Sequence, residues 1–167
     1  MKKYLSAIIS ILGLILIDQY TKFLALTHLK DQEPFIIWNG VFEFRYLENR
    51  GAAFGIFQNR LAFFVIMTII VLIGIVYIYI RTPDTKKYLP LRLTIIFITA
   101  GAIGNMIDRV VRGYVVDFFY FSLIDFPIFN VADIYVTVTF FVLAILLLFY
   151  YKDDELNIYS LKKKNAD

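Results

Sequence analysis

Long runs of hydrophobic residues, separated by short polar segments, dominate this chain. About 20 apolar residues are needed to cross a hydrocarbon core roughly 30 Å thick. Four runs meet this requirement: residues 4–29, 60–81, 90–110 and 127–151. The pattern predicts an all-α membrane protein, in which a bundle of four transmembrane helices forms a single domain over residues 1–167.

Lysine and arginine are distributed unevenly between the two ends of these predicted helices. They are concentrated near the N-terminus, between the second and third runs, and after the fourth run. Because such segments stay in the cytoplasm, we expect both termini and a tail at 152–167 there. The connections at about 30–60 and 109–127 then face outward, on the extracytoplasmic side of the membrane. The first run is expected to remain uncleaved, since Asp18 interrupts it and no convincing small-x-small cleavage site follows.

The first outer connection, at about 30–59, carries a different pattern. Aromatic residues alternate with other types at the period of two that is typical of a strand: Phe42, Phe44 and Tyr46. Gly51 and Gly55 bracket residues 52–54, a turn-rich stretch able to approach another backbone closely. With Phe35 and Trp38, the pattern fits a small extracytoplasmic β-structure at the membrane interface or, alternatively, an ordinary belt of interfacial aromatics.

The amino-acid composition excludes several classes of catalytic and metal-binding site. The chain is 60% hydrophobic and 19% charged, which suits a protein whose exterior is covered by lipid. It has no cysteine, which excludes disulfides, thiol nucleophiles and thiolate metal sites. A single histidine, His28, excludes the multi-histidine sets that catalytic zinc prefers. We expect no metal, no cofactor and no nucleic-acid partner.

Ionisable residues are costly inside a bilayer, so each one requires an explanation. Asp18 and Lys22 are four residues apart in the first run, the favourable acid-before-base order on a helix. We interpret them as a structural ion pair that locks helix packing. Asn105, Asp108 and Arg109 share one helix face at the outer end of the third run.

A second set of polar residues surrounds the start of the fourth run. Asp117 lies in the preceding connection, and Asn130 and Asp133 share a face of the fourth helix. With that helix starting at 127, Asp133 is predicted ~6 residues inside it, or ~9 Å below its start. The alternative for Asp133 is a helix N-terminal charge favoured by the macrodipole. Since all these groups fall at one depth, we predict a single site.

Carboxylates are the groups available for catalysis in this set. Two carboxylates held together in a low-dielectric site cannot both ionise readily, so one retains a proton. The ionised member then accepts a proton from water while the protonated member polarises a scissile carbonyl. We choose Asp117 and Asp133 as the catalytic pair, with nearby Asn and Arg side chains available to bind the substrate backbone.

Five stretches resemble the lipoprotein signal peptidase family, also called signal peptidase II. They occur in the family's order and spacing and span about residues 4–151: Asp18-Gln19-Tyr20-Thr21-Lys22, Asn49-Arg50-Gly51-Ala52-Ala53-Phe54-Gly55, Gly104-Asn105-Met106-Ile107-Asp108-Arg109, Val116-Asp117-Phe118 and Phe129-Asn130-Val131-Ala132-Asp133. The resemblance implies an aspartic endopeptidase that removes signal peptides from bacterial prolipoproteins, just before a diacylglyceryl-modified cysteine.

The resemblance also implies roles for individual residues. Asp117 and Asp133 match the catalytic pair, while Asp18 and Asp108 match positions with mainly structural roles. The positions that contact substrate or the antibiotic globomycin in the family are matched by Asn49, Gly51, Asn105, Arg109 and Asn130. The partners implied are prolipoproteins with a lipid-modified cysteine and membrane lipid, and the chain is expected to act as a monomer.

Two other classes of function are compatible with a small polytopic membrane protein. One is a transporter coupled to ions or drugs that uses Asp18 as its carboxylate. The other is a non-enzymatic assembly or holin-like protein. A transport pathway is expected to scatter polar groups through the bilayer depth, whereas here they gather near one face.

Overall fold

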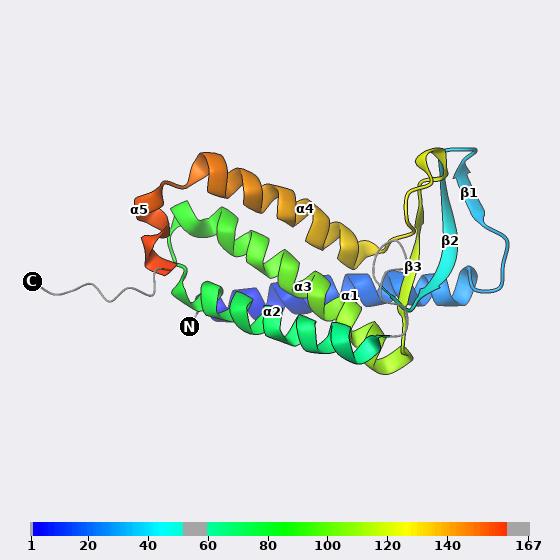
Figure 1. Ribbon diagram of the computed structural model, residues 1–167, viewed down its shortest axis with the longest axis horizontal. Helices are drawn as coiled ribbons and strands as arrows, with labels where there is room; N and C mark the ends of the chain where they lie inside the picture. Colours follow the sequence, from blue (N-terminus) through cyan, green and yellow to red (C-terminus); the bar gives the residue numbers. More distant parts are fainter. Residues whose placement is uncertain (1, 52–59, 160–167) are drawn as a thin grey trace, which may run out of the picture.

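Four long helices lie side by side in the computed structural model, which describes residues 2–51 and 60–159 (Figure 1). They are α1 (Lys2–His28), α2 (Leu61–Arg81), α3 (Leu89–Arg112) and α4 (Val131–Ile145), which continues as a π-helical turn over Leu146–Tyr150. All four are long and apolar enough to cross a membrane. The predicted bundle of four transmembrane helices is therefore confirmed.

A small antiparallel sheet covers one end of the bundle (Figure 1). Its order is β1 (Phe35–Trp38), β2 (Phe42–Asn49) and β3 (Val115–Tyr120). The alternation at Phe42–Tyr46 thus marks a true strand. Strand β3 was not predicted, and residues 52–55 of the expected turn-rich stretch lie outside the described residues.

Helix α3 packs against each of the other three helices. Two glycines allow the closest approaches. A Cβ built on Gly101 would lie 2.6 Å from the Ala132 carbonyl oxygen of α4, and one on Gly104 would lie 2.5 Å from Asp18 Oδ2 of α1. Since real Cβ atoms do not make such contacts, glycine is needed at both positions, and α3 is held close to α1 and α4.

The start of α4 differs from the prediction. The apolar residues Pro127, Ile128 and Phe129 do not begin the helix, because Phe129 forms a β-bridge with Phe119 of β3. The helix begins at Val131, four residues later than the predicted 127. Asn130 is its N-cap and Asp133 its third residue, joined in a capping box. Asp133 therefore lies in the first helical turn, not ~9 Å below the start of the helix, and its carboxylate caps the helix N-terminus.

The opposite end of the bundle holds the short helices η2 (Lys86–Tyr88), α5 (Asp153–Leu156) and η5 (Asn157–Tyr159). Tyr88 donates a 2.7 Å hydrogen bond to the Glu155 carbonyl, and Thr82 and Tyr159 hydroxyls are 2.7 Å apart. The first part of the predicted tail therefore packs against the helices. Its remainder, with the basic residues 162–164, lies outside the described residues.

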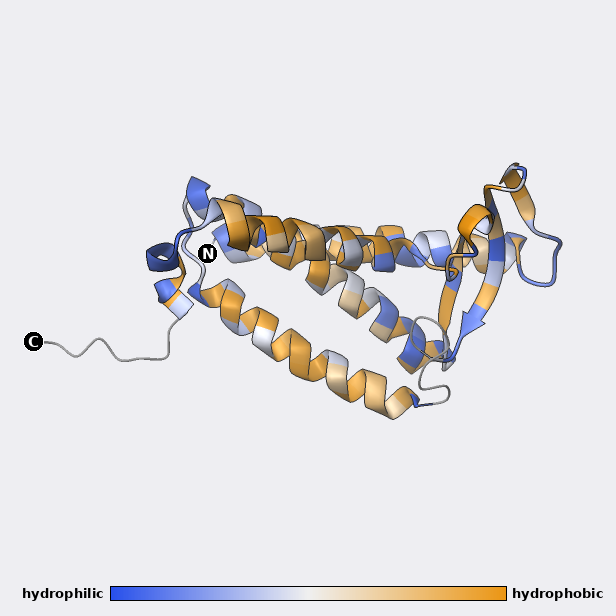
Figure 2. Cartoon of the chain, turned by 45° about the horizontal axis from the view of Figure 1, so that its top comes forward, coloured by the Kyte–Doolittle hydropathy of each residue, from blue (hydrophilic) through white to orange (hydrophobic). Residues whose placement is uncertain are grey.

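Hydropathy separates the middle of the bundle from its ends (Figure 2). Apolar residues cover the helices along most of their length, and polar residues gather at the sheet end and at the α5 end. Helix α2 has no buried residue at all, which fits a helix whose apolar side chains face lipid.

Candidate active site

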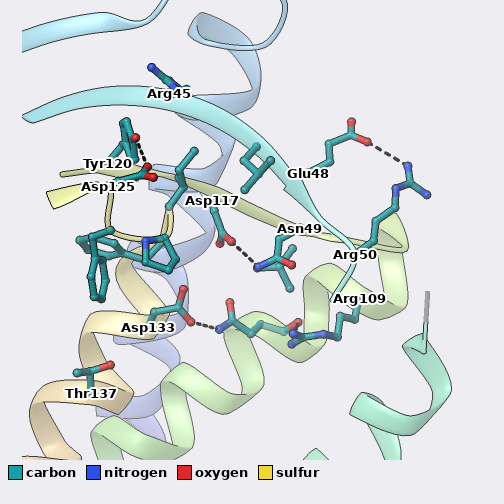
Figure 3. Close-up of a pocket in the computed structure, with 17 residues that line it drawn as sticks. Arg45, Glu48, Asn49, Arg50, Arg109, Asp117, Tyr120, Asp125, Asp133 and Thr137 are labelled. Carbon is teal, nitrogen blue, oxygen red and sulfur yellow. Dashed lines mark hydrogen bonds and ion pairs between the residues drawn. The ribbon is translucent and has the colours of Figure 1, made fainter. Parts of the chain in front are cut away.

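A cavity of about 560 Å³ lies where the sheet meets the ends of α3 and α4 (Figure 3). Asp117 reaches it from β3, and Asp133 reaches it from the first turn of α4. Figure 3 shows the two side chains extending toward the same space. The remaining predicted site residues that line it are Asn49, Asn105 and Arg109.

Asp117 is almost completely buried, with 1% of its surface exposed. Each of its oxygens accepts a hydrogen bond from an asparagine amide. Asn130 Nδ2 donates to Oδ1 at 2.6 Å, and Asn49 Nδ2 donates to Oδ2 at 2.8 Å. These two donors fix the plane of the carboxyl group at the edge of the cavity.

Asp133 is held in the same way by two different groups. Asn105 Nδ2 donates to Oδ1 at 2.7 Å, and the backbone N–H of Asn130 donates to Oδ2 at 3.1 Å. The first bond comes from α3 and the second from the cap of α4, so the carboxyl group joins the two helices.

Asn130 connects the two aspartates. Its side chain donates to Asp117, its backbone donates to Asp133, and its Oδ1 accepts from the Asp133 N–H at 3.0 Å. The residue is fully buried. Asn130 therefore holds both carboxylates. The two aspartates are sixteen positions apart in sequence, and β3 with its connection to α4 brings them together.

The environment of Asp117 changes its acidity. Burial and the neighbouring Asp133 carboxylate raise the pKa of Asp117 to about 7, against the opposing hydrogen bonds from Asn49 and Asn130 and the charge of Lys22. A carboxyl group with this pKa holds its proton for a large fraction of the time at neutral pH. The pair can therefore supply an acid and a base together.

Arg109 and Gly51 lie beside the cavity and contact each other. Arg109 Nη2 donates to the Gly51 carbonyl at 3.3 Å, and its guanidinium lies 4.9 Å from the centre of the Phe64 ring. The Gly51 N–H donates to Asn49 Oδ1 at 3.0 Å. Gly51 thus orients Asn49, whereas Arg109 itself lines the cavity.

Asp18, Lys22 and Asp108 do not line the cavity and form a buried cluster beneath it. Lys22 Nζ lies 3.0 Å from Asp18 Oδ2 and 2.9 Å from Asp108 Oδ2, and all three side chains are completely buried. The predicted Asp18–Lys22 ion pair is present. The polar residues predicted as one group are therefore two, a cavity lining and a supporting ionic cluster.

Both groups also contain residues that the sequence pattern did not predict. Gln19 donates to Asp108 Oδ1 at 3.2 Å, and Arg112 forms an ion pair with the same oxygen. Arg112 follows Asp108 by four positions, a spacing that could have indicated the pair. Tyr120, Asp125 and Phe126 also line the cavity and come from the unpredicted strand and the loop after it. Within the described residues, no group of three His, Cys, Asp or Glu side chains is arranged to hold a metal.

Comparison with known proteins assigns the chain to a family. Residues 10–149 match the family model described as signal peptidase (SPase) II. The chain belongs to the signal peptidase II family. Its resemblance to that family is thereby confirmed, and the chain is a peptidase.

Individual signal peptidase II relatives agree over most of their length. A lipoprotein signal peptidase of Clostridium novyi is 42% identical over 147 residues, which cover 86% of this chain and 97% of the relative. One from Streptococcus thermophilus is 45% identical over 139 residues, covering 83% and 90%. The transporter alternative receives no support from these matches.

Solved structures agree with the fold. A structure described as a bacterial membrane enzyme is 34% identical and superposes with a TM-score of 0.78, covering 95% of this chain and 93% of the other. A second such enzyme is 36% identical with a TM-score of 0.76 and covers 87% and 94%. Together with the four apolar helices, these matches make the chain a multi-pass membrane protein.

Proposed function

We propose that this chain is an aspartic endopeptidase that removes signal peptides from bacterial prolipoproteins, with Asp117 and Asp133 as its catalytic pair. The observation that carries the proposal is that Asn130 donates a hydrogen bond to each of the two aspartates, and that both aspartates line one cavity. The names of the relatives supply the class of substrate.

The pair performs the hydrolysis by moving protons between water, substrate and leaving group. The ionised carboxylate takes a proton from water as the water oxygen bonds to the scissile carbonyl carbon, and the protonated carboxyl gives its proton to the carbonyl oxygen. The C–N bond then breaks. The leaving nitrogen takes the proton that came from water, and a hydroxyl of the tetrahedral intermediate returns a proton to the other carboxylate.

The surroundings of the pair suit a substrate anchored in lipid. A diacylglyceryl-modified cysteine keeps its acyl chains in the bilayer and presents the preceding peptide bond near the surface. The cavity lies at one end of the apolar bundle, so it meets that bond near the extracytoplasmic face if both termini are cytoplasmic. Asn49, Asn105 and Arg109 line the cavity and are proposed to bind the substrate backbone, with Gly51 supporting Asn49. Asn130, expected from the sequence to bind substrate, is fully buried, does not line the cavity and holds the two aspartates instead. A single chain holds every group used here, so we propose a monomer.

Replacing either aspartate tests this proposal. We expect Asp117→Asn and Asp133→Asn each to lower kcat by about 10⁴-fold, because an amide can neither accept nor donate the required proton. Cleavage of a lipid-modified prolipoprotein by the purified enzyme in detergent or lipid is the measurement.

A matched variant separates this effect from a general loss of acidic charge. Asp31→Asn changes an exposed aspartate on the loop between α1 and β1, where Asn tolerates the positive φ of 58°. Its turnover should equal that of the unmodified chain. Normal turnover by folded Asp117→Asn or Asp133→Asn would rule out the aspartic mechanism.

A further inference from the structure

Lys22 lies at the centre of the buried ionic cluster and makes one contact that an ion pair does not require. Besides Asp18 and Asp108, its ammonium donates to Asn105 Oδ1 at 2.9 Å. Asn105 is the residue whose Nδ2 holds Asp133. A single side chain therefore separates the Lys22 charge from a proposed catalytic carboxylate.

The chemistry of the ammonium fixes the direction of this connection. A lysine ammonium has three donors and no acceptor, so it can contact only the carbonyl side of the Asn105 amide. Asn130 Nδ2 also donates to Asn105 Oδ1, at 3.1 Å, so two donors hold this oxygen and the amide NH₂ points at Asp133. If the partner of Asn105 could also accept a hydrogen bond, the Asn105 amide could rotate by half a turn. Its oxygen would then face the Asp133 carboxylate, and the two would repel each other.

The two carboxylates that hold Lys22 also reach the catalytic segments. Asp18 Oδ1 accepts from the backbone N–H of Ala132 at 2.9 Å, and Asp108 Oδ2 accepts from the backbone N–H of Val116 at 3.2 Å. Ala132 immediately precedes Asp133, and Val116 immediately precedes Asp117. The same cluster is therefore attached to the backbone beside each catalytic residue.

We propose that Lys22 is a positioning residue for the catalytic pair: it orients Asn105 toward Asp133 and, through Asp18 and Asp108, holds the backbone beside both aspartates. This inference rests on the proposed function. It goes beyond a lock for helix packing, because it predicts that loss of Lys22 changes the chemistry of the enzyme molecules that still fold.

The charges around Lys22 set the expected dependence on pH. The groups that face it are Asp18 from α1 and Asp108 and Asn105 from α3, with Arg112 and Gln19 behind Asp108. Asp117 of β3 and Asp133 of α4 lie within range of its charge. Because the positive charge favours ionisation of the pair, its removal should raise the pH at which the pair loses its first proton, and with it the acid limb of the pH profile of kcat.

The test uses the full chain with Lys22→Met, which keeps the apolar stem, and Lys22→Gln, which keeps an NH₂ donor without the charge. Turnover is expressed per folded molecule, measured by a monodisperse peak and a cooperative melting transition. We expect Lys22→Met to lower kcat about 10²-fold at unchanged KM, as for a reacting group displaced by about 1 Å. Lys22→Gln should lower kcat by a smaller factor, and the acid limb should move to higher pH in both variants.

Lys3→Met is the matched control. Lys3 lies on the same helix and donates to the Thr82 carbonyl at 2.6 Å, at the end of the bundle away from the cavity. It should lower the melting temperature and leave kcat and the acid limb unchanged. A folded Lys22→Met enzyme with the kcat and acid limb of the unmodified chain would overturn the inference.

Asp108→Asn keeps the inference testable if the Lys22 variants do not fold. It weakens the hold on Val116 while Lys22 and Asp18 remain, so kcat per folded molecule should fall, and an unchanged kcat and acid limb would overturn the inference. Asp117→Asn and Asp133→Asn are assayed alongside. Turnover by these two would sink the proposed function itself, whereas their inactivity beside normal Lys22 variants would sink the positioning role alone.

Discussion

Three asparagines surround the proposed catalytic pair, and a different donor orients each of them. The carbonyl oxygen of Asn105 faces the Lys22 ammonium, that of Asn130 faces the Asp133 N–H, and that of Asn49 faces the Gly51 N–H. Since each of these partners donates, every amide turns its NH₂ toward a carboxylate. The asparagines thus hold the pair before any substrate arrives. The sequence placed these residues at the site but gave no sign that they orient the aspartates.

The raised pKa of Asp117 predicts how stability depends on pH. Unfolded, this carboxyl ionises near pH 4, whereas in the folded chain its pKa is about 7. Between these values the folded state binds more protons, so the free energy of unfolding decreases as pH rises from 4 to 7. Asp117→Asn removes this contribution, and the melting temperature of the unmodified chain should fall relative to that variant over this window.

Thermal melts between pH 4 and 8 measure this difference. Only the change in the gap between the two curves is informative, because the new amide places an NH₂ against one of the two asparagine donors that hold Asp117. Asp31→Asn serves again as the control and should follow the unmodified chain at every pH. Parallel curves for Asp117→Asn would show that Asp117 ionises normally.

At the scale of elements, the sequence predicts those helices and strands that have a clear hydropathy pattern of their own. The helices follow from apolar runs of the right length, and β2 follows from its alternation of aromatic and polar residues. Strand β3 has no such alternation, since its first four residues are all buried. A strand buried on both faces loses the alternation, and the apolar run of β3 is also interrupted by the buried Asp117.

The start of α4 was misplaced for a related reason. Hydropathy cannot separate Pro127–Phe129 from the helix that follows, because these residues are as apolar as the helix itself. The bridge between Phe119 and Phe129 depends on β3 and is invisible without it. The capping box of Asn130 and Asp133 carries the better local signal. The two errors are linked, because the bridge that delays the start of α4 requires the strand that the pattern did not reveal.

The approach of α3 to α1 predicts the effect of adding one methyl group. Gly104→Ala places a Cβ 2.5 Å from Asp18 Oδ2, a carboxylate held by Lys22 and the Ala132 N–H. Neither partner can move without breaking the cluster. We expect a loss of about 1–3 kcal/mol in the free energy of unfolding, as for overpacked cores, together with a fall in kcat.

Gly13→Ala is the matched control, since no atom lies within 4 Å of a Cβ at Gly13 of α1. It should leave the melting temperature the same or slightly higher, because alanine favours helix. Denaturation in detergent and turnover of both variants provide the measurements. Equal stability of Gly104→Ala and the unmodified chain would mean that the buried cluster is not held as tightly as its contacts indicate.

The molecule as a whole has two unlike ends joined by an apolar bundle. One end holds the sheet and the cavity that Asp117 and Asp133 line, and the other holds α5 and the basic loop between α2 and α3 (Figure 1). The exposed aromatic and aliphatic residues of β1, among them Trp38 with 68% of its surface exposed, suit the interface beside the cavity. Under the proposed function, a lipid-anchored substrate would approach the sheet end along the bilayer surface.

The distribution of basic residues predicts which end faces the cytoplasm, and the absence of cysteine makes this directly testable. Asn39→Cys lies in the β1–β2 connection at the sheet end, and Lys86→Cys lies in η2 at the opposite end. Both residues are exposed. A membrane-impermeant maleimide should label Asn39→Cys in intact spheroplasts and Lys86→Cys only after lysis, with both variants retaining turnover. The reverse pattern would place the proposed catalytic pair at the cytoplasmic surface and contradict the predicted orientation.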